Sequence, residues 1–529
     1  MTARVTITGI NQCIGVDKLP SSFKTISVII FLLILLGCHN KLKQSSIELD
    51  EQTISQIHQA YKTGRYNSQQ LVKAYIQQIN RYDGKLNAIT IINTNALSSA
   101  KQLDEEYKKT GVLRPLHGIP VLVKDNINTI GLPTTGGSLA LESFIPKSDA
   151  FVINRLLDAG AIILAKTNMA EWAFSAKHTE SSTKGSTYNA YDQKYVPAGS
   201  SGGTAAGIAT NFAVIGLGTD TGNSIRGPSS HNALVGFRTT LGLISREGII
   251  PLILRNDVVG PMSRTVEDAT RLIEIMAGYD ANDQLTEYSN GKIPGNYQQF
   301  LQKDGLKGAR IGVLRELILE DADPEVMQLF ETAIADIKRL GASVIDEVTI
   351  PHFADLAKNQ WCVDFRQDVE DYLITYVKDD ALSTVEDIIK IGTKSEYAKK
   401  QLTFFAANSG RMGDVKTACS DAFNDSLRLA FRNAIEKEMD RLKLDALIYP
   451  TWSNPPARIV AFEEEYKGDN SQIIAPHTGQ PAFTVPMGFT HGNLPAGLQF
   501  LGRMFDEPGL IKLTYAYEQG THHRKPPAK

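Results

Sequence analysis

Two glycine-rich segments carry serines that could act as nucleophiles. Residues 198–203 hold Ser200 and Ser201, and residues 220–228 hold Ser224. Glycine has no side chain, so a substrate can approach its backbone N–H groups closely. Serines in such surroundings are typical of covalent catalysis, provided that a nearby base can take the hydroxyl proton.

The candidate base is a lysine rather than a histidine. Lys124 follows the apolar run 121–123, and burial there would help the amine to lose its proton. A free lysine titrates near ~10.4, so the pKa must fall by several units for this role. Lys166 ends a second apolar run, 162–165, in a very similar setting. The residue pattern by itself does not choose between the two lysines.

The order and spacing of these segments resemble the amidase signature family. Residues 118–126, 198–203 and 220–228 carry the resemblance, and segments at 444–450, 479–486 and 494–500 continue it. The family includes bacterial amidases, fatty acid amide hydrolases and the A subunit of the glutamyl-tRNA amidotransferase. Several separated motifs in one order make a far more specific signal than a single glycine pattern.

The resemblance implies a catalytic role for three of these residues. Ser224 is then the nucleophile, and Ser200 connects it to the base Lys124. The peptide bond between Gly199 and Ser200 is expected to be cis, and no metal or cofactor is implied. The backbone N–H groups expected to bind the oxyanion are those of Thr221, Gly222, Asn223 and Ser224.

The sequence departs from the family pattern at two positions. Ala198 stands where a glycine is common, and Asn223 replaces the second glycine before the nucleophile. Asparagine tolerates positive φ better than most residues, so we expect the oxyanion turn to persist. We also expect the Asn223 side chain to narrow or polarise the acyl site. Asp220 and Arg226 are interpreted as charges that hold the loop in place.

Other catalytic interpretations use the same residues. Residues 199–203 match the G-x-S-x-G nucleophile elbow, which would make Ser201 the nucleophile with a downstream histidine as base. Such an elbow follows a strand, and residues 191–197 are a poor strand sequence. A dinucleotide site lacks its third glycine after 216–218, and no H-E-x-x-H metal motif is present. The histidines available to an elbow are His231, His352, His477 and His491.

The N-terminal segment indicates export. Residues 26–36 are almost wholly apolar and follow Lys18 and Lys24. As a helix they would rise only ~16 Å, too little to cross ~30 Å of hydrocarbon, so they fit a secretory signal. Residues 35–38 resemble a bacterial lipobox ending at Cys38. We therefore predict a signal peptide over 1–37, a polar tether over 38–53, a catalytic domain over 54–527, and a lipoprotein anchored to the membrane of the cell envelope.

Plain secretion and a leader without function are the other interpretations of this segment. Cys362 and Cys419 are the only cysteines after Cys38. An oxidising compartment could pair them. Two cysteines in a chain of this size are more often buried and free, and that is the interpretation we favour.

The composition is that of a globular protein without a nucleic-acid surface. It is 42% hydrophobic and 21% charged, with a net charge of −3. Short apolar runs alternate with helical patterns, which predicts an α/β fold. The resemblance implies one large domain with a mixed central sheet covered by helices. Much of 361–442 has a helical pattern, and we interpret its aromatic residues as core rather than pocket: Trp361, Phe365, Tyr372, Phe404 and Phe405.

The resulting hypothesis is an exported amidase that converts a small-molecule amide to acid plus ammonia or amine. The reaction would pass through an acyl-enzyme on Ser224 and use no cofactor. The main alternative is the glutamine-hydrolysing subunit of a tRNA-dependent amidotransferase. A non-catalytic envelope lipoprotein that binds amides is a third possibility. Neither the individual substrate nor the oligomeric state follows from the sequence.

Overall fold

The structure is a computed structural model that describes residues 47–413 and 419–528. Residues Leu49–Lys529 form one compact unit. The predicted signal peptide and Cys38 lie outside the described residues. In the described part, no helix has both the length and the apolar character needed to cross a bilayer.

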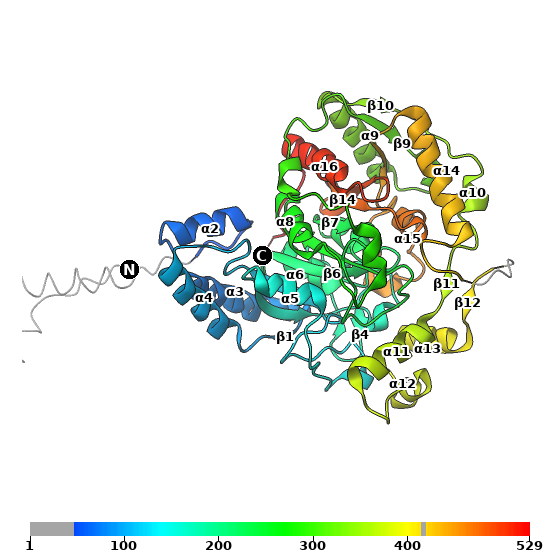
Figure 1. Ribbon diagram of the computed structural model, residues 1–529. Helices are drawn as coiled ribbons and strands as arrows, with labels where there is room; N and C mark the ends of the chain where they lie inside the picture. Colours follow the sequence, from blue (N-terminus) through cyan, green and yellow to red (C-terminus); the bar gives the residue numbers. More distant parts are fainter. Residues whose placement is uncertain (1–46, 414–418, 529) are drawn as a thin grey trace, which may run out of the picture. The chain divides into compact units, whose positions relative to one another are not determined.

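The compact unit is built on one mixed sheet of eleven strands (Figure 1). Strands β2, β3 and β6 run parallel, as do β9, β10 and β13, while antiparallel strands join these two groups. The predicted mixed α/β sheet is therefore confirmed. In spatial order the strands are β1 (Ile89–Ile92), β3 (Ile162–Thr167), β2 (Pro120–Lys124), β6 (Ile215–Asp220), β8 (Val258–Ser263), β7 (Val235–Arg238), β14 (Ala482–Thr490), β15 (Leu494–Leu501), β13 (Ala446–Pro450), β9 (Arg310–Val313) and β10 (Ser343–Ile345).

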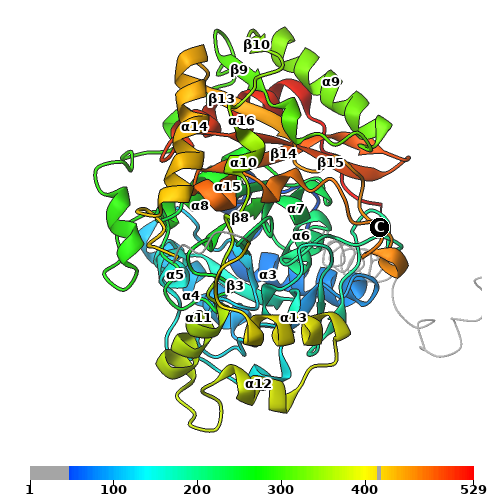
Figure 2. The same ribbon diagram turned by 90° about the vertical axis from the view of Figure 1, so that its right-hand side faces the viewer.

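Helices surround this sheet (Figures 1 and 2). Residues 54–82 hold two helices, each of which begins with a capping box, at Thr53 and at Asn67. The helices are α2 (Ile54–Lys62), α3 (Ser68–Tyr82), α4 (Ala96–Thr110), α5 (Phe151–Asp158), α6 (Gly202–Ala209), α7 (Arg226–Ser230), α8 (Val266–Met276), α9 (Pro324–Arg339), α10 (Phe353–Leu356), α11 (Phe365–Tyr372), α12 (Val385–Ile391), α13 (Glu396–Ala407), α14 (Ser426–Leu442), α15 (Ala475–Thr478) and α16 (Glu507–Thr521).

The strands that position the catalytic candidates are buried along their whole length. Every residue of β2, β3 and β6 is buried. Parallel strands that are covered on both faces read as nearly continuous apolar runs, which is why no polar alternation is seen in 120–123 or 162–165. The lysines at or near the ends of two of these strands are therefore buried as well.

Helices α11, α12 and α13 form a separate layer. Figures 1 and 2 both place them together at one end of the unit, away from α9 and α14. Their apolar side chains pack with Leu141, Trp172, Phe174 and Ile250 in a cluster of their own. This layer packs against the loops that hold Trp172 and Ile250.

Two expectations about the chain's organisation need correction. Cys362 of β11 (Cys362–Val363) and Cys419 are joined by a disulfide, so they are not free thiols. The predicted tether also ends earlier than residue 53, because Leu49 is buried and the carboxylate of Glu51 accepts hydrogen bonds from Arg524. Composition alone did not reveal these contacts, since their partners are distant in sequence.

Candidate active site

Lys124 ends β2 with its amine surrounded by oxygen atoms. Its Nζ lies 2.7 Å from Ser200 Oγ and 2.7 Å from Thr219 Oγ1, and 3.4 Å from the carbonyl oxygen of Thr219. Ser200 stands just before α6, and the Gly199–Ser200 peptide is cis, as expected. The structure thus brings together the lysine and the serine that the motifs had indicated from distant segments.

Burial changes the protonation of Lys124. The side chain is fully buried, and this desolvation lowers its pKa to about 7, although Asp257 and Asp220 act in the opposite direction. A substantial fraction of the amine is therefore neutral near pH 7. A neutral amine beside a serine hydroxyl can accept its proton.

Lys166 is equally buried but faces different partners. In the register of β2 and β3 it pairs with Val123, whereas Lys124 pairs with Thr167. Successive side chains point to opposite faces of a sheet, so the two lysines leave it on opposite sides. Lys166 Nζ donates to Ile127 O at 2.6 Å and to Thr134 Oγ1 at 2.8 Å, and it pairs with Asp125 at 3.6 Å. It contacts none of the three candidate serines.

Ser201 lacks the surroundings of a nucleophile elbow. Its hydroxyl donates to the Thr219 carbonyl at 3.3 Å, and residues 191–197 form no strand. Among the described residues, no histidine makes a hydrogen bond to Ser201. His231 instead packs on Trp452, and His491 pairs with Asp323. The geometry therefore offers this serine no base.

The Ser224 loop is held by a buried charge cluster. The carboxylate of Asp220, at the end of β6, accepts the N–H of Ile225 at 3.1 Å and binds both Arg226 and Arg238. Burial alone would raise the pKa of Asp220, but the two guanidinium groups outweigh burial and lower it to about 2. The predicted loop-fixing role of Asp220 and Arg226 agrees with this geometry. Ser224 lies directly before Ile225, whose N–H is bound by Asp220, and two residues before the start of α7.

The backbone before Ser224 is open to a ligand. Within the described ranges, the N–H groups of residues 221–224 donate no hydrogen bond to protein atoms. Four unengaged donors at a strand–helix turn can bind a developing oxyanion. Ser224 Oγ itself donates to Asn223 Oδ1 at 3.4 Å. No hydrogen bond joins Ser200 to Ser224 in the described chain, so the connection between them belongs to the proposal below.

Both departures from the family pattern now have a local account. Asn223 does not adopt positive φ, so the turn at this position does not require a residue that tolerates the left-handed region. Its side-chain amide donates to Asp469 at 2.9 Å, which ties the loop to the neighbouring segment. Ala198 does adopt a left-handed φ of 60°, which explains why glycine suits that position.

Ser224 opens into an apolar cavity of about 330 Å³. Trp361, Phe404 and Phe405 line it, so the expectation that they are core residues was wrong for these three. Phe365 and Tyr372 are core residues, as expected, and Tyr372 also lines a different cavity. A helical pattern shows which face is apolar, but it does not show whether that face meets a neighbouring helix or a cavity. The lining of the Ser224 cavity is completed by Ala173, Phe174, Ala176, Thr221, Gly222, Asn223, Leu252, Ile253, Val363, Met412 and Gln472.

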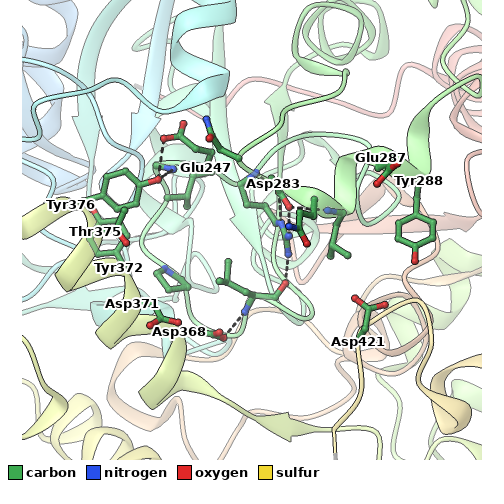
Figure 3. A pocket seen from close by; sticks show the side chains of 18 of the residues that line it. Glu247, Asp283, Glu287, Tyr288, Asp368, Asp371, Tyr372, Thr375, Tyr376 and Asp421 are labelled. Atoms are coloured by element: carbon green, nitrogen blue, oxygen red, sulfur yellow. Dashed lines mark hydrogen bonds and ion pairs between the residues drawn. The ribbon is translucent and has the colours of Figure 1, made fainter.

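The cavity that Tyr372 lines is larger, about 930 Å³, and strongly acidic (Figure 3). Tyr372 and Tyr376 stand on one wall, and Tyr288 stands on the opposite wall. Burial raises the pKa of Asp368, one of its carboxyl groups, to about 7. None of the candidate serines lines this cavity. Its chemistry is therefore separate from that of the Ser224 cavity.

Comparison with known proteins defines the family. The family model described as Amidase matches residues 70–511. A probable amidase of Arabidopsis thaliana is 34% identical over 518 residues, which cover 94% of this chain and 95% of that protein. The A subunit of the glutamyl-tRNA(Gln) amidotransferase of Methanosarcina barkeri is 33% identical over 494 residues, which cover 90% of this chain and 98% of that protein.

A solved structure agrees with these matches. The native peptide amidase of Stenotrophomonas maltophilia superposes with a TM-score of 0.80 at 33% identity, and the match covers 90% of this chain and 99% of that one. The chain belongs to the amidase signature family. It is an amide hydrolase that acts on C–N bonds other than standard peptide bonds.

Proposed function

We propose that the protein is an exported amidase that hydrolyses carboxylic amides with a bulky apolar acyl group through an acyl-enzyme on Ser224. The observation that carries the catalytic part is the buried amine of Lys124, 2.7 Å from the hydroxyl of Ser200. A second contribution comes from the open N–H groups beside Ser224. Together they provide a base, a proton carrier and an oxyanion site.

In this proposal the proton and the covalent bonds move in a balanced sequence. Neutral Lys124 takes the proton of Ser200, which takes that of Ser224 as its oxygen attacks the amide carbon. The N–H groups of residues 221–224 bind the oxyanion. Lys124 then returns the proton through Ser200 to the leaving nitrogen, and the C–N bond breaks. Water hydrolyses the resulting ester by the same route and releases the acid.

The cavity favours an apolar acyl group. All of its lining residues in the described chain are uncharged, and the lining includes four aromatic side chains, Phe174, Trp361, Phe404 and Phe405. Apolar pockets bind ligands mainly through surface burial, while a few polar groups fix orientation. Besides Ser224, the polar side chains that line it are those of Thr221, Asn223 and Gln472. The proposed substrates are therefore amides of aromatic or long aliphatic acids, and amides at the end of a peptide with an apolar last residue.

The glutamine-hydrolysing subunit is the second candidate, because relatives of that kind match most of the chain. Free glutamine carries an ammonium and a carboxylate, which require charged or strongly polar partners when buried. The described lining of the Ser224 cavity supplies no charged group. Purified protein that hydrolyses apolar amides by itself, and glutamine not at all, would favour the first candidate; the reverse would favour the second.

Export remains part of the proposal. The disulfide between Cys362 and Cys419 supports it, because structural disulfides persist mainly in oxidising compartments. We propose that the chain is processed before Cys38 and held on the membrane by a lipid on that residue. A palmitate analogue should then label the wild-type protein but not Cys38→Ala. Equal labelling of both proteins would exclude the anchor.

The nucleophile can be identified directly. A fluorophosphonate probe reacts with activated serines, and peptide mapping should place the adduct on Ser224. Ser224→Ala should abolish labelling while the protein keeps its melting temperature. An adduct on Ser201 would instead support the nucleophile-elbow interpretation.

A further inference from the structure

Thr219 supplies two of the three oxygen atoms around the Lys124 amine. Its Oγ1 lies 2.7 Å from Nζ, and its carbonyl oxygen lies 3.4 Å away. The third oxygen is Ser200 Oγ at 2.7 Å. Thr219 is buried near the end of β6, one residue before Asp220. It therefore borders the proposed proton path without being one of the residues that the motifs had singled out.

Asn126 holds the Thr219 hydroxyl in place. Its Nδ2 donates to Thr219 Oγ1 at 3.1 Å and to the carbonyl of Ile250 at 3.2 Å. The backbone oxygen of Asn126 also accepts the N–H of Ile250 at 2.8 Å. Because the same Nδ2 of Asn126 donates to the carbonyl of Ile250, the atom that faces Thr219 must be the amide nitrogen and not the amide oxygen. The Thr219 hydroxyl therefore accepts this bond with one of its lone pairs.

The number of N–H bonds on the Lys124 amine shows how the two Thr219 oxygen atoms can orient it. A neutral lysine amine has two N–H bonds and one lone pair. If both N–H bonds are directed to Thr219, the lone pair faces Ser200, which is the orientation that a base needs. We propose that Thr219, held by Asn126, is a positioning residue that directs the lone pair of Lys124 toward Ser200.

The same arrangement suits the protonated state. An ammonium group has three N–H bonds, and the three oxygen atoms around Nζ match them in number. The amine can therefore gain and release a proton along the Ser200 direction without turning. This inference rests on the proposed role of Lys124 as base.

Two carboxylates also act on the charge of Lys124. Asp220 and Asp257 both favour its protonated form. Asp220 is bound by Arg226 and Arg238, and Asp257 accepts the hydroxyl of Thr221. Neither carboxylate makes a hydrogen bond to Lys124 within the described chain. The direct contacts that can orient the amine are therefore those from Thr219 and Ser200.

Thr219→Val tests the proposal, because valine keeps the shape but removes the hydroxyl. We expect kcat to fall by about 10–100-fold with little change in KM, since the lone pair is no longer held in line. Loss of an acceptor also disfavours the ammonium form, so the acid limb of the kcat profile should move down by roughly one pH unit. Thr219→Ser should restore both properties.

A matched control separates positioning from packing. Thr204 is also buried and hydrogen-bonded through its hydroxyl, to Thr167, but it makes no hydrogen bond to Lys124. Thr204→Val should therefore leave the acid limb in place. If Thr219→Val does not fold, Asn126→Leu provides the second variant and should move the limb in the same direction by a smaller amount.

The outcomes distinguish this inference from the proposed function. A Thr219→Val protein with wild-type kcat and an unmoved acid limb would overturn the positioning role. So would a loss of kcat with an unmoved limb, because that indicates only a packing defect. Lys124→Ala measured alongside tests the base itself. If Lys124→Ala retains wild-type activity, the proposed function fails, whatever Thr219→Val does.

Discussion

Lys124 and Lys166 lie one register step apart on neighbouring parallel strands, and their side chains leave the sheet on opposite faces. The amine of Lys124 forms a hydrogen bond with Ser200, and that of Lys166 forms an ion pair with Asp125. Two lysines with nearly the same sequence context are thereby separated by the alternation of side chains along a strand.

This relationship predicts different effects for two matched substitutions. Lys124→Ala removes the proposed base and should lower kcat by about 10²–10⁴-fold. Lys166→Ala leaves the buried carboxylate of Asp125 without its partner, which should lower the free energy of unfolding by about 3–5 kcal/mol. The folded fraction of Lys166→Ala should retain a kcat close to that of the wild type. Turnover assays beside thermal melts would distinguish the two effects. The opposite pattern would mean that the base has been assigned to the wrong lysine.

The pH dependence of wild-type activity should reflect Lys124. Burial lowers the pKa of this amine to about 7, and the protonated form cannot accept a proton. We therefore expect kcat to rise about tenfold per pH unit below that value and to reach a plateau above it. Lys166→Ala should leave the position of this limb unchanged. A kcat that falls as pH rises through 7 would contradict a lysine base.

The Asp220 cluster should stabilise the Ser224 loop in a pH-dependent manner. Its folded-state pKa of about 2 lies below its ordinary value of 3.8, so the stabilisation is complete above the ordinary value and is lost as pH falls through about 2. Asp220→Asn leaves two buried guanidinium groups without a carboxylate, which should cost about 3–5 kcal/mol at pH 7. The stability difference between Asp220→Asn and the wild type should shrink on acidification from pH 5 to pH 2. A difference that stays constant over this range would argue against the ion pairs as its cause.

The disulfide should contribute both to stability and to the shape of the substrate cavity. It joins residues 57 positions apart, and loop-closure entropy predicts a stabilisation of about 4 kcal/mol. The bond joins Cys362, which follows Trp361 directly, to Cys419, which lies beyond Met412 in the chain. Trp361 and Met412 both line the cavity. We expect Cys362→Ser/Cys419→Ser to melt at a lower temperature and to raise KM more than it lowers kcat. Thiol titration of the unfolded wild-type protein should find no free thiol at Cys362 or Cys419 unless a reductant is present.

Local sequence motifs identify the catalytic candidates but not the contacts between distant segments. Lys124, Ser200 and Ser224 lie in motifs whose glycines and apolar runs already describe their surroundings, so they could be singled out before any fold was known. The contact of Thr219 with Lys124 could not, because a threonine at the end of a buried strand carries no chemical signature by itself. The disulfide was missed for a related reason. Two cysteines predict a bond only when the path of the chain between them is known.

The acyl cavity also depended on packing between distant segments. Trp361 precedes β11, whereas Phe404 and Phe405 lie in α13, and all three line the cavity of Ser224, which lies far from them in sequence. Phe365, in α11, belongs to the same segment of the chain and shares its apolar pattern, but it faces the core. A helical pattern of apolar residues is the same whether they line a cavity or pack in the core. Only the tertiary packing of the segment decides between the two environments.

That difference provides the last prediction. Trp361 lines the Ser224 cavity and is only partly buried, whereas Phe365 is fully buried between Trp172 and Phe174. Trp361→Ala should therefore lower kcat/KM for amides of bulky apolar acids by about 10–100-fold, because it removes roughly 1.5–3 kcal/mol of apolar contact with the acyl group. It should change kcat/KM for acetamide less, since a methyl group buries far less apolar surface against the ring. Phe365→Ala should instead lower the free energy of unfolding by about 3–5 kcal/mol through the cavity it creates, and it should change the substrate ratio less, because its ring reaches the Ser224 cavity only through Phe174 and Phe405. Measuring both amides and the denaturant midpoint for each variant separates the two roles. An unchanged substrate ratio in Trp361→Ala would show that the acyl group binds elsewhere.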